Sequence, residues 1–116
     1  MNLNETIFRE YDIRGIVNVD FSKEVVEKLG KAFGSYIKRQ GGNNISVSGD
    51  IRESSPILKK HFISGIISTG VNVFDTGILP TPVNYYSMYH LNTDAAVQIT
   101  GSHNPKEFNG FKFSCI

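Results

Sequence analysis

The chain has 116 residues, of which 40% are apolar and 20% are charged, and its formal net charge at pH 7 is +1. This is the balance of one ordinary globular domain, and so small a net charge does not favour nucleic acid or an anionic membrane as a partner. A single cysteine, Cys115, excludes an internal disulfide. The sequence shows no signal-peptide pattern and no apolar run of membrane-spanning length. We therefore expect a cytoplasmic protein that does not enter a membrane.

The first half of the chain predicts two helices around one strand. A short extended segment near Ile7–Phe8 precedes a helix that begins after Ser22, a typical N-cap residue, and closes at Gly41–Gly42. Ile45–Ser48 then alternates apolar and polar residues, which indicates a strand. A second helix is predicted over Ser55–Gly70, with its apolar residues at helical spacing.

The second half predicts three strands and a third helix. Val71–Phe74 is a predicted strand, followed by a proline-containing loop over Gly77–Pro82. The aromatic-rich segment Pro82–Leu91 is the predicted third helix. Ala95–Ile99 and Gly110–Cys115 are the last two strands, close enough in sequence to pair antiparallel.

The order of these elements predicts an α/β domain over residues 1–116. We expect a three-layer-like arrangement, with a mixed, mostly parallel sheet of about four strands flanked by helices. The chain stops directly after a strand, with no further helix to cover it. This ending suggests a fragment of a longer protein.

Three polar loops have ordinary structural explanations when each is taken alone. In the segment 8–15, Arg9 and Arg14 could hold a phosphate, but a surface turn with internal ion pairs is the simpler interpretation. The loop 49–55 lies between a strand and a helix, where Ser54 and Ser55 are equally explained as helix caps. The two prolines in the loop 76–82 indicate structural packing.

The segment Thr100–Pro105, TGSHNP, is chemically the most informative. It places Ser102 and His103 together on a turn, with Lys112 on the strand that follows. A serine hydrolase would need a separate base within reach of the serine, and the sequence has no G-x-S-x-G elbow. Phosphoryl transfer needs only a hydroxyl and cations that neutralise the phosphate, which Arg14 and Lys112 could supply.

Four motifs in order resemble the α-D-phosphohexomutases, most closely the bacterial phosphomannomutase/phosphoglucomutase group. TGSHNP, with Asn109–Lys112 after it, is similar to the phosphoserine loop of that family. Phe8–Gly15 resembles its N-terminal signature, Asp50–Ser55 its D-x-R-x-S-S loop, and Gly77–Pro82 its G-x-x-P-T-P turn. Together the four motifs cover nearly the whole chain, which makes a chance match very improbable.

The resemblance implies a role for each matching residue. Ser102 would carry the phosphoryl group, and its phosphate would contribute one ligand to Mg²⁺. His103, Lys112, Arg14 and Tyr11 would line the catalytic site. The remaining residues of the phosphate loop are Thr100, Gly101, Asn104 and Pro105. Two further residues would support the loop from behind, Asp50 and Arg52.

The implied reaction interconverts hexose 6-phosphate and hexose 1-phosphate, of mannose or glucose, through a hexose 1,6-bisphosphate that also serves as activator. Family members have four domains, and this chain resembles only the first. The resemblance places the metal loop, the sugar loop and the substrate-phosphate site in the other three. The chain alone is therefore expected to be inactive, with those domains and a phosphosugar as its partners. Ser48 stands where the family usually has glycine.

Two other interpretations remain open. One is the corresponding domain of a phosphoglucosamine mutase. The other is a truncated, non-catalytic module that binds phosphosugars or a partner domain. An apolar interface left uncovered in such a fragment would favour self-association.

Overall fold

The computed structural model describes residues 8–9, 12–78, 93–101 and 104–115. The helix predicted over Pro82–Leu91 lies outside these residues, as does most of the loop predicted before it. Three predicted site residues also lie outside them: Tyr11, Ser102 and His103.

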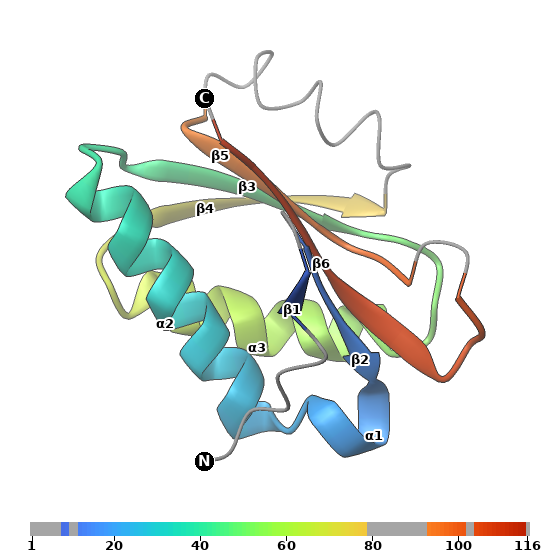
Figure 1. Cartoon of the computed structure of the whole chain (residues 1–116). Helices are drawn as coiled ribbons and strands as arrows, with labels where there is room; N and C mark the ends of the chain where they lie inside the picture. The colour runs from blue at the N-terminus through green and yellow to red at the C-terminus, as the bar shows by residue number, and fades with distance from the viewer. Residues whose placement is uncertain (1–7, 10–11, 79–92, 102–103, 116) are drawn as a thin grey trace.

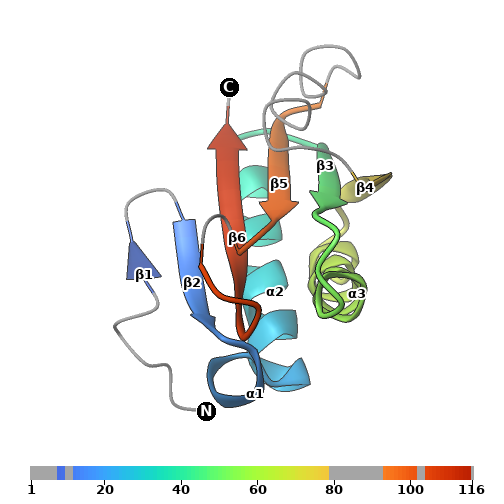
Figure 2. The ribbon, with the colours of Figure 1, turned by 90° about the vertical axis from the view of Figure 1, so that its right-hand side faces the viewer.

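A six-stranded mixed sheet forms the centre of the domain, with the spatial order β1-β2-β6-β5-β3-β4 (Figure 2). Strand β3 pairs parallel with β4 and with β5, whereas the other three pairs are antiparallel. The bounds of the strands are β1 Phe8–Arg9, β2 Asp12–Ile16, β3 Asn44–Gly49, β4 Asn72–Ile78, β5 Ala95–Ile99 and β6 Phe108–Cys115.

The α/β class and the mixed sheet are confirmed, and the sheet is wider than predicted. Among the four strands expected from the sequence, two of the three pairs are parallel. The additional strand β2 lies in a segment that was expected to be a polar loop. It pairs with β6 along its whole length, from Asp12 opposite Lys112 to Ile16 opposite Phe108. This strand was not predicted, because its charged residues interrupt the hydrophobic pattern on which the prediction depends. It forms nonetheless, because backbone pairing does not depend on apolar side chains.

Two long helices cover one face of the sheet (Figure 1). Helix α2, Lys23–Arg39, follows the single turn α1, Val17–Asp20, and its first turn is capped by Ser22, whose Oγ accepts from the Val25 N–H at 3.2 Å. Helix α3, Ser55–Ile67, ends before the predicted Gly70, which follows it at a φ of +88°. A third layer on the opposite face stays a prediction.

The two helices cross in backbone contact, which only glycine allows here. A Cβ atom at Gly30 would lie 2.2 Å from the Phe62 carbonyl oxygen, and one at Gly65 would lie 2.1 Å from the Glu27 carbonyl oxygen. This approach lets both helices reach the sheet, where Phe62 stacks on Phe111 with ring centroids 4.8 Å apart. Across the described residues, none of the helices combines the length and the apolar character needed to cross a membrane.

Candidate phosphoryl-transfer loop

Backbone hydrogen bonds link the described residues of the loop between β5 and β6. The Asn104 N–H donates to the Gly101 carbonyl at 3.0 Å, and the Phe108 N–H donates to the Pro105 carbonyl at 3.0 Å. A further bond of 2.9 Å joins the Thr100 N–H to the Gly110 carbonyl where the loop leaves the sheet. The described ends of the loop are therefore folded back on themselves.

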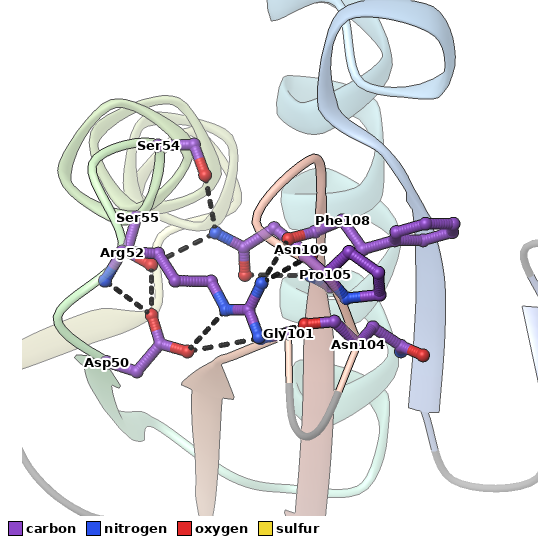
Figure 3. Close-up of polar contacts among 10 residues, drawn as sticks. Asp50, Arg52, Ser54, Ser55, Gly101, Asn104, Pro105, Phe108 and Asn109 are labelled. Carbon is purple, nitrogen blue, oxygen red and sulfur yellow. Dashed lines mark hydrogen bonds and ion pairs between the residues drawn. The ribbon is translucent and has the colours of Figure 1, made fainter.

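The side chain of Arg52, which lies in the loop after β3, donates hydrogen bonds to backbone carbonyl groups of the loop between β5 and β6 (Figure 3). Its Nη1 donates to the Pro105 oxygen at 2.7 Å and to the Phe108 oxygen at 3.1 Å, and its Nη2 donates to the Asn104 oxygen at 2.7 Å. The planar guanidinium presents several donors in fixed directions, which suits three carbonyls gathered around one point. We call this arrangement the Arg52 clamp.

Asp50 connects the clamp to the end of β5. One carboxylate oxygen lies 3.3 Å from Arg52 Nε and accepts from the Gly101 N–H at 3.1 Å, and the other accepts from the Ser55 hydroxyl at 2.6 Å. Burial raises the pKa of Asp50, but the hydrogen bonds from Ser55, the Arg52 and Gly101 backbone and Thr100 outweigh it and leave the pKa below its ordinary 3.8. Asp50 is therefore a fixed anion at neutral pH.

Gly101 is required by the closeness of the clamp. A Cβ atom built there would lie 2.1 Å from Cζ of Arg52 and 2.3 Å from its Nε. The guanidinium is held by its hydrogen bonds, so it could not move aside without losing them. The residue directly before Ser102 must therefore lack a side chain.

Asn109, at the start of β6, was not predicted as a site residue. Its side chain is fully buried, and its Nδ2 donates to the hydroxyl oxygens of Ser54 at 2.8 Å and Ser55 at 3.0 Å. Ser54 is the N-cap residue of α3, yet its side chain makes no capping bond. The helix-cap explanation of the two serines is thus wrong: they bind Asn109 and Asp50 instead. No signal in the sequence alone could have identified Asn109, because its burial and its partners appear only in the fold.

Lys112 and Arg14 lie on adjacent strands of the sheet. Lys112 is opposite Asp12 of β2 and opposite Gln98 of β5, whereas Arg14 is opposite Gly110. Residues that face one another or are two apart share one side of a sheet, so both cations belong to the face opposite the helices. On that face Ser48 donates a hydrogen bond to the fully buried Gln98.

The structure therefore brings together one part of the predicted site. Around the clamp it gathers five predicted residues: Asp50, Arg52, Gly101, Asn104 and Pro105. The Thr100 hydroxyl also bonds to Asp50. Lys112 and Arg14 come from the sheet rather than from the loop. Within the described part of the chain, no three His, Cys, Asp or Glu residues gather as metal ligands do.

Comparison with known proteins gives the family. The family described as "Phosphoglucomutase/phosphomannomutase, alpha/beta/alpha domain I" matches residues 5–115. The chain belongs to this family. The match extends through all three segments that build the clamp.

Similarity to individual relatives supports this family assignment. The chain is 43% identical over 110 residues to a phosphomannomutase/phosphoglucomutase of Pseudomonas putida, which covers 95% of the chain and 24% of that protein. It is 46% identical over 100 residues to a Thermococcus gammatolerans protein named "Probable phosphoglucosamine mutase", covering 86% of the chain and 22% of the relative. A crystal structure of a phosphoglucomutase/phosphomannomutase family protein from Burkholderia thailandensis superposes with a TM-score of 0.89 at 37% identity, covering 97% of the chain and 26% of that protein. The chain thus spans about a quarter of the length of these relatives.

Proposed function

We propose that this chain is the phosphoserine-carrying domain of a phosphohexomutase that interconverts hexose 6-phosphate and hexose 1-phosphate. The observation that supports it most is the pair Arg52 and Asp50: the Arg52 clamp holds the backbone after Ser102, and Asp50 holds the Gly101 N–H before it. A hydroxyl that must meet two different oxygens of a sugar needs a fixed position. Family membership supplies the reaction class.

The proposed reaction has two transfers. In the first, the P–O bond to Oγ of phosphorylated Ser102 breaks as a hydroxyl oxygen of the hexose monophosphate forms a new bond to phosphorus, and the proton of that hydroxyl ends on Ser102 Oγ. In the second, the hexose 1,6-bisphosphate has turned round, Ser102 Oγ bonds to its other phosphorus, the P–O bond from that phosphorus to the sugar breaks, and the Ser102 proton ends on the sugar oxygen. Such transfers depend mainly on positioning and on neutralising charge.

Two cations on the sheet are suited to neutralising the charge of the phosphate. Arg14 and Lys112 would offset the charge of the transferring phosphoryl group, and they come from the same face of neighbouring strands. Tyr11 and His103 are proposed to contact the sugar or the transferring group. Asp50 and Arg52 would act on the loop and not on the substrate.

The metal is proposed on the resemblance alone. The Ser102 phosphate would supply one ligand of Mg²⁺, and the resemblance implies that the other ligands lie outside this chain.

The hexose is proposed to be mannose or glucose, because the N-terminal signature resembles that branch. A phosphoglucosamine mutase is the second candidate, since a relative carrying that name is as similar as those named for mannose and glucose. With only a quarter of the relatives' length, the chain alone is expected to be inactive. A non-catalytic phosphosugar-binding module is the third candidate.

A chimaera tests the phosphoserine directly. In it, this chain replaces the matching residues of the Pseudomonas putida relative, and the purified protein is incubated with glucose 1,6-bisphosphate. Peptide mass spectrometry should find one phosphate, on Ser102. A phosphate on any other residue of the chain, with Ser102 unmodified, would contradict the proposal.

A further inference from the structure

A chain of hydrogen bonds runs from β6 to the loop (Figure 3). Asn109 Nδ2 donates to Ser55 Oγ at 3.0 Å, and Ser55 Oγ donates to one carboxylate oxygen of Asp50 at 2.6 Å. These two bonds point in the same direction, and hydrogen bonds aligned in this way strengthen one another. The other carboxylate oxygen of Asp50 accepts from the Gly101 N–H at 3.1 Å, so the carboxylate joins Ser55 to the start of the loop.

The orientation of the Asn109 amide is set by its own strand. Its Oδ1 accepts from the Gly110 N–H at 2.9 Å, so its Nδ2 must face α3. The side chain is 0% exposed, and Ser55 is 1% exposed, so water does not compete for either group. Loss of the amide would leave the buried Ser55 oxygen without its donor.

We propose that Asn109 is a positioning residue, which fixes the Gly101 N–H, and with it the start of the phosphoryl-transfer loop, through Ser55 and Asp50. Ser55 has one hydroxyl hydrogen. While Asn109 donates to its oxygen, that hydrogen is directed to Asp50. Without Asn109, the Ser55 hydroxyl loses the donor that fixes its orientation, and its hydrogen bond to Asp50 weakens. The use of the loop in phosphoryl transfer rests on the proposed function, but the coupling itself does not.

Nearby charges do not explain the coupling. The charged group in contact with Asp50 is Arg52, from the same loop, and no ion pair in the described residues links another charge to it. The groups that reach it from α3 and from β5 are the Ser55 hydroxyl and the Thr100 hydroxyl and Gly101 N–H. The side-chain path from Asn109 to Asp50 therefore runs through Ser55, whereas Arg52 reaches this strand through the backbone carbonyl of Phe108.

The test is nuclear magnetic resonance on the 116-residue chain, which needs no catalysis. In Asn109→Ala, we expect hydrogen exchange of the Gly101 amide to accelerate at least about fivefold, the effect of one ordinary hydrogen bond. The pKa of Asp50, followed on its side-chain carbon, should rise. Exchange of the Val47 amide, in the centre of the sheet, reports whether the fold as a whole is retained.

Two variants make the result decisive. Ser54→Ala removes the other acceptor of Asn109 but not the path to Asp50, so its Gly101 exchange and Asp50 pKa should match those of the original chain. In Ser55→Ala, the addition of Asn109→Ala should shift neither quantity further. If Asn109→Ala still raises the pKa of Asp50 in the Ser55→Ala background, or never alters Gly101 exchange, the coupling does not exist. If Asn109→Ala does not fold, Asn109→Leu fills the space without a donor or a charge, and the same outcomes apply.

A failed phosphoserine experiment would leave this result unchanged. Conversely, Ser102 could accept phosphate while exchange of the Gly101 amide stays the same in Asn109→Ala. That result would support the proposed function and would contradict the role of Asn109 as a positioning residue.

Discussion

The guanidinium of Arg52 donates a hydrogen bond of 2.7 Å to the carbonyl oxygen of Pro105, which lies 53 residues further along the chain. The bond joins the end of one parallel strand, β3, to the loop after its neighbour β5. In open α/β sheets such loops meet at one edge, and ligands bind there. The clamp therefore holds the loop after β5 to the loop after β3 at this edge.

Removal of the Arg52 clamp should destabilise the domain. Arg52→Ala loses three hydrogen bonds to carbonyls and the ion pair to Asp50, so we expect the free energy of unfolding to fall by about 2–3 kcal/mol. Arg52→Lys keeps the charge but not the fork of donors, and should recover only part of the loss. Urea denaturation measures both. The exposed Arg39→Ala is the control, expected within about 0.5 kcal/mol of the original chain. Equal losses at Arg39 and Arg52 would contradict the clamp.

A side chain at Gly101 should displace the guanidinium. In Gly101→Ala the new Cβ would overlap Arg52 Cζ, so we expect a loss of about 1–3 kcal/mol. Gly49→Ala is a matched control in the same region, because its Cβ meets only ordinary contacts of 3.4 Å or more. In an Arg52→Ala background the cost of Gly101→Ala should largely disappear. A cost that is unchanged in that background would show that Arg52 is not the obstacle.

Asp50 should make stability depend on pH in the acidic range. Its folded pKa lies below the ordinary 3.8, so its stabilising effect is complete above that value and is lost as the pH falls through the folded pKa. The free energy of unfolding, measured from neutral pH downward, should fall less steeply in Asp50→Asn than in the original chain. Asp75, whose hydrogen bond with Lys59 also lowers its pKa despite partial burial, provides the comparison: Asp75→Asn should remove a separate part of the slope. An identical slope in the original chain and Asp50→Asn would refute this assignment.

The helices and strands that were predicted correctly are those that follow from repeated patterns in the sequence. Helix α2, its Ser22 cap and the strands β3 and β5 follow from apolar spacing and capping, and all were found close to their expected places. Strand β2 was missed because its residues alternate charge with small and apolar groups in a short segment, and only its pairing with β6 identifies it.

The candidate site, like the fold, was predicted from the sequence only in part. Residue types and motif order indicated the loop, with Asp50 and Arg52 behind it. The role of Asn109 could not be seen, since its partners Ser54 and Ser55 lie over 50 residues away and have an obvious alternative use as helix caps. Contacts between distant segments decide which of two local explanations holds.

Exposed apolar residues favour self-association of the isolated chain. Ile51, just after β3, is 87% exposed, and Ile78, the last residue of β4, is 63% exposed. Both lie at the carboxyl ends of neighbouring strands, the edge that also holds the clamp. We expect light scattering to show dimers or larger species that diminish in an Ile51→Ser, Ile78→Ser double variant. A monomer at high protein concentration would contradict this expectation.

The central claim is that Ser102 carries the phosphoryl group, and turnover by the chimaera with the Pseudomonas putida relative tests it most directly. Conversion of hexose 1-phosphate to hexose 6-phosphate is measured with glucose 1,6-bisphosphate present, in the chimaera and in its Ser102→Ala variant. Ser114→Ala, a serine on β6 outside the proposed machinery, is the control for the substitution itself. We predict that Ser102→Ala abolishes turnover and that Ser114→Ala retains it. Near-normal turnover in Ser102→Ala would contradict the account.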